Sequence, residues 1–409
     1  MAGKWAETTL GRLLSFANGR SSPERADGLP YPVYGSNGVI GRAAAPNSDA
    51  GSIVIGRVGS YCGSLYLSKE RCWVTDNAIR ATALDDNDSR FLFYLLGTLS
   101  LNNWRAGSGQ PLLNQDILSR IPAAVPEPVE QRAIAHILGT LDDKIALNRR
   151  MSETLEAMAR ALFKSWFVDF DPVRAKAQGR DPGLPKPLAD LFPARLVDSE
   201  LGEIPEGWEW GTFDAVVELR RETENPLESP DVAFRHFSIP AYDEGQWPKH
   251  EVGESIKSLK ARVPAGVVLL SKLNPEIERV WLVDVQPGDR AICSTEFLVL
   301  VPRPPHGRSH VYCLARSQSF RQELEGLVTG TSKSHQRAQA AAILGLAVVR
   351  PPESLLRRFE QAAEPLLART LECRRESRTL AALRDALLPK LISGEIRIGD
   401  AEKFIGRAV

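Results

Sequence analysis

Two long segments of the chain carry one helical pattern, and the second repeats the first about 225 residues later. In each, apolar side chains recur at alternating steps of four and three residues, the spacing of a helix that packs against another helix. Prolines open both segments, as suits a first helical turn. The seam positions expected to pack helix on helix are Ile134, Leu138, Leu141, Ile145, Leu155, Leu162, Phe359, Leu366, Leu380 and Leu387. A surface helix on a globular core is the alternative, and the shared register favours mutual packing.

The segments before the two helices also correspond, in the same order. The pairs are "KWAETTLGRLLSF" (4–16) with "EGWEWGTFDAVVEL" (206–219), "AGSIVIGRVGS" (50–60) with "AGVVLLSKLNP" (265–275), "VTDNAIRATAL" (74–84) with "CSTEFLVLVPR" (293–303), and "GSGQPLLNQDILSRIPAAVP" (107–126) with "GTSKSHQRAQAAAILGLAVVRPP" (330–352). Each match is weak alone, but their common order indicates a duplicated module.

The duplication predicts an α/β (α+β) chain of two globular modules in pseudo-twofold repeat, separated by the two helices. The predicted parts are module one (1–125), a central helix (126–168), a proline-rich linker (169–205), module two (206–349), a distal helix (350–398) and a tail (399–409). The linker has no sustained periodicity, which predicts an extended connection over the surface.

Composition points to no particular ligand. The chain has 51 Lys and Arg against 51 Asp and Glu, so it lacks the basic footprint of a nucleic-acid-binding domain. Its 5 cysteines are dispersed, which favours reduced thiols over a disulfide frame or a zinc site. No long apolar run and no signal-peptide profile occur. We therefore expect a cytoplasmic protein with no membrane contact.

No catalytic motif stands out. The chain lacks a phosphate-binding P-loop, a G-x-S-x-G elbow, an H-E-x-x-H pair and an Asn/Asp-Pro-Pro-aromatic motif. The glycine-rich "PYPVYGSNGVIG" (30–41) has the wrong spacing for a dinucleotide loop, and no long helix pattern follows it. It predicts a tight turn instead, in which glycines supply positive φ or a close backbone approach. Two modules without an active site favour a binding protein that reads a bipartite target.

The chain resembles the specificity subunit of type I restriction–modification enzymes over essentially its whole length. The resemblance is carried by "LFKSWFVDFDPV" (162–173), "LGEIPEGWEW" (201–210) and "ALLPKLISGEIRI" (386–398). Within the modules, "PVYGSNGVIG", "SKERCWVTDNAI", "GSGQPLLNQDIL" and "GTSKSHQRAQ" resemble motifs of that family's target-recognition domains.

This resemblance implies two domains that each read half of an asymmetric bipartite DNA site. It implies antiparallel helices that dock two copies of an N6-adenine methyltransferase subunit, and a motor-nuclease subunit that completes the complex. The chain itself would be non-catalytic and bind no cofactor, with S-adenosylmethionine, ATP and Mg²⁺ used by the partners. A self-contained DNA methyltransferase or nuclease with fused specificity domains, and a coiled-coil scaffold without a DNA role, stay open as alternatives.

Side chains that can pair with base edges, on loops, are the candidate DNA contacts. In module one these are Ser36, Asn37, Arg57, Ser60, Tyr61, Thr75, Asp76, Asn77, Ser108, Gln110 and Asn114. In module two they are Arg235, His236, Lys272, Asn274, Ser294, Thr295, Glu296, Thr331, Lys333, Ser334, His335, Gln336 and Arg337.

Each candidate has a structural alternative. A lone Ser, Asn or Asp in a loop is often a turn or cap residue, and Arg57 could be a surface charge at a strand end. The tryptophans are expected in the core. The cluster of Phe163, Trp166 and Phe167 predicts either core or a docking surface.

Overall fold

Both predicted helices are present, each as one element of 40 residues. Helix α4 spans Pro128–Phe167 and α11 spans Glu353–Ile392 in this computed structural model. The structure describes residues 5–105, 112–328 and 336–401. It divides into two units: unit 1 comprises Met1–Asn148 and Arg375–Val409, and unit 2 comprises Arg149–Arg374. Each long helix therefore gives one half to each unit, so the helices are shared parts of both modules.

Unit 1 is a mixed α and β structure. Its elements before α4 are β1 (Ala6–Thr9), α1 (Leu10–Leu13), β2 (Leu14–Asn18), β3 (Tyr31–Gly35), β4 (Gly38–Ala43), β5 (Ile53–Gly56), η1 (Gly59–Tyr61), β6 (Leu65–Leu67), β7 (Trp73–Val74), β8 (Ala78–Ala83), α2 (Ser89–Thr98), η2 (Leu101–Trp104), α3 (Gln115–Arg120) and β9 (Pro122–Val125). They form sheets of order β2-β8-β5-β6 and β4-β3-β7 and a pair β1-β9.

Unit 2 contains more strands. After the linker come β12 (Glu209–Thr212), η3 (Phe213–Ala215), β13 (Val217–Arg220), β14 (Thr223–Glu224), η4 (Pro226–Glu228), β15 (Ala233–Phe237), α7 (Ile239–Asp243), β16 (Lys249–Val252), η5 (Gly253–Ser255), β17 (Lys260–Arg262), β18 (Val268–Ser271), β19 (Val280–Leu282), β20 (Ala291–Cys293), β21 (Phe297–Pro302), α8 (Arg308–Ala315), α9 (Gln318–Gly326), α10 (Ala340–Leu344) and β22 (Ala347–Arg350). The sheets are β13-β21-β18-β19 and β14-β17-β20-β15-β16, with a pair β12-β22.

The internal repeat predicted from the sequence is confirmed by the strand order. The sheet β2-β8-β5-β6 of unit 1 matches β13-β21-β18-β19 of unit 2, strand for strand along the chain. The pair β1-β9, which closes the first module, matches β12-β22 in the second. Helices α2 and α8 follow the matching strands β8 and β21. The two frameworks, each of six strands and one helix, are thus one design, and the other sheet differs between the units, with three strands in unit 1 and five in unit 2.

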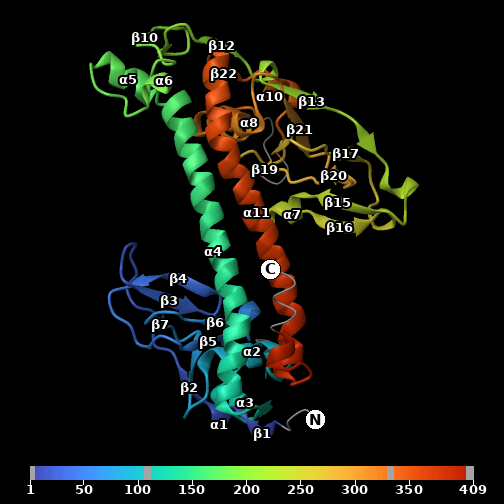
Figure 1. Cartoon of the computed structure of the whole chain (residues 1–409). Helices are drawn as coiled ribbons and strands as arrows, with labels where there is room; N and C mark the ends of the chain where they lie inside the picture. Colours follow the sequence, from blue (N-terminus) through green and yellow to red (C-terminus); the bar gives the residue numbers. More distant parts are fainter. Residues whose placement is uncertain (1–4, 106–111, 329–335, 402–409) are drawn as a thin grey trace. The chain divides into compact units, whose positions relative to one another are not determined.

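In each unit, the halves of α4 and α11 lie side by side in opposite directions (Figure 1). In unit 1, Arg384 contacts Asp142 at 2.7 Å and Glu376 contacts Asn148 at 2.9 Å. The residue numbers increase along α4 as they decrease along α11, so the two helices are antiparallel. In unit 2, the rings of Phe163 and Phe359 are 5.8 Å apart.

The structure places the predicted seam residues on this helix pair. Ile134, Leu138, Leu141, Phe359, Leu380 and Leu387 are buried, and Ile145, Leu155, Leu162 and Leu366 are partly buried. Each helix also buries a second face against its module: Leu367 and Leu371 lie outside the predicted seam, in one core with strand residues such as Val268 and Leu300. A heptad seam alone therefore underestimates how much of α11 is buried.

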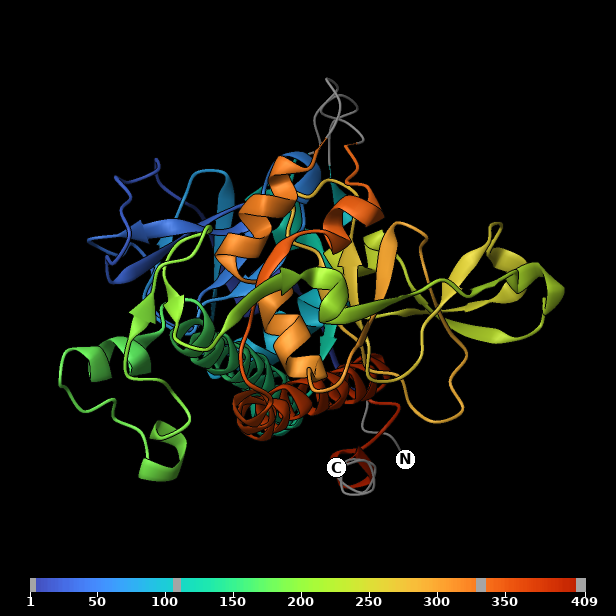
Figure 2. The same ribbon diagram turned by 90° about the horizontal axis from the view of Figure 1, so that it is seen from above.

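The linker differs from the extended surface connection expected for it. It forms α5 (Asp171–Ala177), α6 (Lys186–Ala189) and a hairpin of β10 (Leu196–Val197) and β11 (Ile204–Pro205). Phe170, Val173 and Phe192 join the core of unit 2, because their apolar area outweighs the local turn propensity. In Figures 1 and 2, α5 and α6 lie on the opposite side of the long helices from the five-stranded sheet. Within the described ranges, no helix has the length and apolar character to cross a membrane.

Candidate nucleic-acid interface

Three loop segments of unit 1 are held together at one end of its four-stranded sheet. The Arg57 N–H donates to the Asn77 carbonyl at 3.0 Å, and the Leu113 N–H donates to the Arg57 carbonyl at 3.1 Å. Val58 and Leu112 pair as an isolated antiparallel bridge. We call the segments 57–58, 75–77 and 112–113 the first platform. Segment 57–58 bonds both of the others, so it is the central segment of the platform. It directly continues β5, so the sheet fixes the position of the loops.

Unit 2 contains the same arrangement with different side chains. The Lys272 N–H donates to the Glu296 carbonyl at 3.0 Å, and the Ala338 N–H donates to the Lys272 carbonyl at 3.0 Å. Leu273 and Arg337 form the matching bridge. Segments 272–274, 294–296 and 336–338 are the second platform. Its Lys272, Glu296 and Arg337 occupy the places of Arg57, Asn77 and Leu112.

A left-handed turn follows the central segment of both platforms. Gly59 has a φ of 73°, and Asn274, at the matching position, has a φ of 49°. Glycine adopts this conformation freely, and asparagine is among the few other residues that tolerate it. The turn closes in the same way in both units, by Cys62 N–H to the Gly59 carbonyl and Ile277 N–H to the Asn274 carbonyl. The asparagine in module two is thus explained by backbone geometry.

The glycine-rich stretch forms a β-hairpin beside the first platform, as its tight-turn prediction required. Strands β3 and β4 are joined by Ser36 and Asn37, and Gly38 has a φ of 96°. The Ser36 hydroxyl donates to the Asn77 carbonyl, which ties the turn to the platform. The hairpin adds Asn37, which is exposed, to the polar surface there.

Gly56 permits this close assembly. A Cβ at this position would lie 2.2 Å from the Tyr61 carbonyl oxygen and 2.9 Å from that of Ser36. Real Cβ atoms do not approach backbone this closely, so only glycine fits. The structure thereby brings together the predicted residues Ser36, Asn37, Arg57, Ser60, Tyr61, Asp76 and Asn77, and all but the half-buried Ser36 and Arg57 are exposed.

Four predicted DNA contacts have structural roles instead. Thr75 is buried, with 1% of its surface exposed. Asn114 caps α3, its side chain accepting from the Ile117 N–H at 2.8 Å. Arg235 is buried on β15 and pairs with Asp289. His236, on the same strand, contacts Glu251 at 2.6 Å, and burial lowers its pKa. We remove these four from the proposed contacts, because each is either buried or already bonded to another group of the protein.

The remaining module-two candidates split between the second platform and an undescribed stretch. Lys272, Asn274 and Gln336 are partly buried on the platform, as is Ser294, which lies beside the exposed Thr295. Arg337 is exposed and bonds Glu296 at two points. Ser108, Gln110, Thr331, Lys333, Ser334 and His335 lie outside the described residues. Sequence reasoning chose both Glu296 and Arg337 but missed that they bind each other, since nothing local links positions 41 residues apart.

The aromatic candidates are mostly core. Phe163, Trp166 and Phe167 are buried in the core of unit 2, so they form no docking surface. Trp208 and Trp281 are buried as predicted, and Trp5 and Trp73 are partly buried. Trp104 is the exception, with 42% of its surface exposed.

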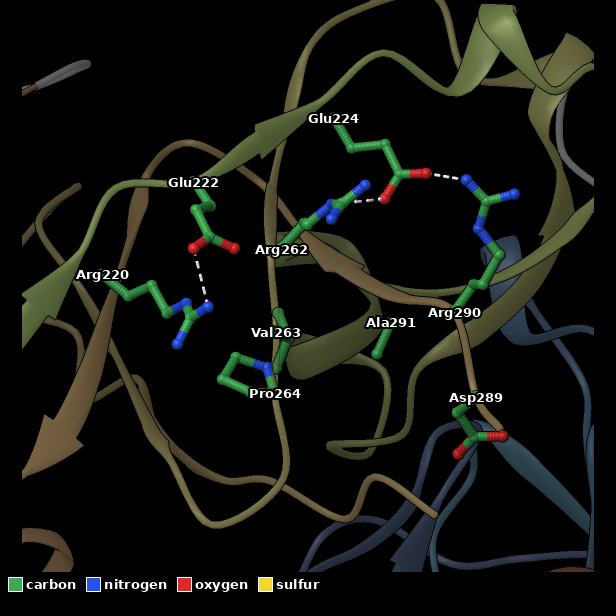
Figure 3. Close-up of a pocket in the computed structure, with 9 residues that line it drawn as sticks. All are labelled: Arg220, Glu222, Glu224, Arg262, Val263, Pro264, Asp289, Arg290 and Ala291. Carbon is green, nitrogen blue, oxygen red and sulfur yellow. Dashed lines mark hydrogen bonds and ion pairs between the residues drawn. The ribbon is translucent and has the colours of Figure 1, made fainter. Parts of the chain in front are cut away.

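A charged crevice of about 350 Å³ is a second place to examine in unit 2 (Figure 3). Glu224 bonds both Arg262 and Arg290, and Arg220 pairs with Glu222. Its guanidinium groups are therefore neutralised by their own carboxylates, which disfavours capture of a phosphate there. No group of three or more His, Cys, Asp or Glu side chains within the described ranges could hold a metal.

The chain is similar in sequence to known DNA specificity proteins. Residues 3–157 match the family described as the type I restriction modification DNA specificity domain. The chain is 25% identical over 324 residues to the type I restriction enzyme MjaIX specificity subunit of Methanocaldococcus jannaschii, covering 76% of this chain and 69% of that protein. It is 25% identical over 336 residues to the HindI specificity subunit of Haemophilus influenzae, covering 70% and 71%.

A solved structure supports the fold. The S subunit of a type I restriction–modification system from M. genitalium superposes with a TM-score of 0.61 at 14% identity, over 95% of this chain and 96% of that chain. This superposition supports the overall fold described above. Residues 3–157 thus match the type I DNA specificity domain, and the chain is similar to type I restriction enzyme specificity subunits over 70% or more of its length.

Proposed function

We propose that this chain is the DNA sequence-specificity subunit of a type I restriction–modification complex and catalyses no reaction itself. The observation that carries the proposal is the pair of platforms: one backbone arrangement, presented twice, with different side chains at matching positions. A reader built this way contacts two half-targets of different sequence. The target is then an asymmetric bipartite site in double-stranded DNA.

The proposed partners are two copies of an adenine methyltransferase subunit and a motor-nuclease subunit. Docking through the long helices is supported by apolar side chains left exposed on α4, where Leu147 is 49% and Met158 is 52% exposed. Contiguous exposed apolar surface marks association sites, and a partner helix that covers both residues would form one. S-adenosylmethionine, ATP and Mg²⁺ are cofactors of the partners in this proposal, and the complex works in the cytoplasm.

A DNA-binding subunit without net charge needs other subunits to contribute the cations that bind DNA phosphates. Most of the salt-dependent free energy of DNA binding comes from cations placed on phosphates, and this chain has no net charge. Partner subunits that clamp the duplex supply those cations in the complex. The platforms then select the sequence, while the assembly provides most of the affinity.

Mapping of N6-methyladenine in the native host tests the proposal. We expect methylated adenines in a two-part sequence with a fixed spacer, lost when this chain is deleted and restored when it is supplied again. An unchanged methylation map after deletion would refute the proposal. It would leave the scaffold role as the explanation of the helices.

The enzyme alternative needs its own experiment. Purified chain, S-adenosylmethionine and host DNA are incubated with and without the methyltransferase subunits, and methyl transfer is measured. We expect transfer only with the partners present. Methylation by the chain alone would establish the self-contained enzyme.

A further inference from the structure

Arg337 and Glu296 form a two-point ion pair on the second platform. The arginine Nε lies 3.0 Å from one carboxylate oxygen of Glu296, and its Nη2 lies 2.9 Å from the other. The Arg337 side chain is 51% exposed and that of Glu296 is 21% exposed. The carboxylate thus lies under the guanidinium, which faces solvent.

The geometry of this pair leaves one edge of the arginine available. A guanidinium carries five N–H donors in a planar fork. Glu296 uses the edge formed by Nε and Nη2, so the end edge, formed by Nη1 and the second N–H of Nη2, has no partner among the described residues. Two donors on one edge of an arginine side chain that is 51% exposed are therefore available to a ligand.

Both backbones of the pair are fixed by the platform. Arg337 pairs with Leu273 across the bridge, and the Glu296 carbonyl accepts from the Lys272 N–H. The Glu296 N–H in turn contacts the Ser294 hydroxyl at 3.3 Å. The arginine is thus oriented before any ligand arrives, which reduces the entropy lost on binding.

Two parallel N–H donors match one base in the major groove. Guanine presents the O6 and N7 acceptors side by side there, and arginine is its commonest bidentate partner. The Glu296 side chain is 21% exposed and that of Arg337 is 51% exposed, so the guanidinium is the better placed of the two groups to reach a base. We propose that Arg337, oriented by Glu296, reads a guanine in the half-target bound by unit 2, with Glu296 as a positioning residue.

Unit 1 provides the internal comparison. Its platform carries Leu112 and Asn77 at the places of Arg337 and Glu296. Leucine offers no donor to a base edge, so unit 1 has no counterpart of this contact at the matching position. This inference rests on the proposed function, and it adds a base and a residue to it.

The test uses the complete methyltransferase complex and maps its methylated sites. Wild type is compared with Arg337→Gln, Arg337→Lys and Glu296→Gln, and with Arg195→Gln as the control. Arg195 in the linker forms a more exposed pair with Glu206, away from the platforms in sequence and hydrogen bonding. Asn77→Ala in unit 1 identifies which half of the motif each unit reads.

We expect a guanine in the unit 2 half of the wild-type motif. Arg337→Gln should lower the preference for guanine over other bases at that one position by about 10- to 100-fold, the range for a lost bidentate base contact. Arg337→Lys should relax it too, because an ammonium cannot reproduce the fork. Glu296→Gln should loosen the same position by a smaller factor, since the arginine stays but is no longer held. Arg195→Gln should leave the motif unchanged.

Three results would overturn the inference. The first is a unit 2 half-target without guanine, and the second is an Arg337→Gln motif that is still strict at every position. The third is a loss of methylation that is uniform across positions and is restored in Arg337→Lys, which is the behaviour of a phosphate contact. If Arg337→Gln prevents assembly, Arg337→Lys and Glu296→Gln decide alone, because both nearly preserve side-chain volume. Absence of any bipartite methylation by the wild-type complex would instead refute the proposed function itself.

Discussion

Asn148 donates from its side-chain amide to the carboxylate of Glu376 at 2.9 Å, within the seam of the helix pair in unit 1. Asn148 has no exposed surface, so its amide is shielded from solvent. Lys144 also reaches Glu376, at 3.2 Å. A polar residue at one seam position disfavours other registers, because a shifted helix would leave the amide unpaired.

Removal of this amide should destabilise the helix pair. Asn148→Ala leaves Glu376 with one donor fewer and creates a small cavity, so we expect a loss of about 1–3 kcal/mol in the free energy of unfolding, measured by urea titration. Arg149→Ala, at the exposed neighbouring position, should change it by less than about 0.5 kcal/mol. Equal effects of the two variants would show that the seam contact contributes nothing.

Gly56 should be intolerant of any side chain. Gly56→Ala would press a methyl group into the Tyr61 and Ser36 carbonyls, at a cost of about 1–3 kcal/mol, and would disturb the first platform. The methylation map of the assembled complex should then loosen in the unit 1 half-target alone. Gly97→Ala, in helix α2 with open space around it, should instead stabilise unit 1 by about 0.5–1 kcal/mol. Loosening in both half-targets would contradict the assignment of Gly56 to one platform.

Two buried histidines should make unit 2 sensitive to mild acid. Burial lowers the pKa of His306 to about 4, and burial together with His306 lowers the pKa of His310 well below its ordinary range. Above about pH 6.5 both rings are neutral whether the chain is folded or unfolded. As the pH falls from about 6.5 towards 4, both imidazoles bind protons in the unfolded chain but stay neutral in the folded chain. The free energy of unfolding therefore falls.

His310→Phe tests this directly, since Phe91 occupies the matching place in α2 of unit 1. We expect the variant to raise stability by about 1 kcal/mol at pH 7, because the Nδ1 of His310 is buried without a partner among the described residues. Its advantage should widen between pH 6.5 and 4, as followed by thermal melting. The exposed His250→Gln should change neither value, and a constant gap across this pH range would contradict the expectation.

The exposed apolar residues of α4 should contribute to subunit assembly. Leu147→Asp and Met158→Asp are expected to lower co-purification of the methyltransferase subunits at least tenfold when combined, because each replaces buried apolar contact with a desolvated charge. Helical content, followed by circular dichroism, should not change. Leu259→Asp alters an equally exposed leucine away from the helices and should assemble normally. Loss of assembly in that control as well would point to general destabilisation.

The sequence by itself determined the repeat, the two long helices and the common order of the matching segments in both modules. Heptad spacing and alternating apolar segments are local signals, so they survive without knowledge of the tertiary contacts. It also aligned Arg57 with Lys272 as equivalent positions and predicted a turn at Ser36 and Asn37. The structure places Arg57 and Lys272 at matching positions of the two platforms and forms that turn. Contact of these loops with DNA stays a prediction.

Only the tertiary structure decided what individual side chains do. Arg235 and Arg337 are both arginines of module two, yet one is buried against Asp289 and the other is exposed above Glu296. The partners of these arginines lie 54 and 41 residues away in the chain, so no local pattern reports them. Burial and pairing are set by which strands and loops the sheet brings together, and for that reason the choice between structural and reading roles belongs to the fold.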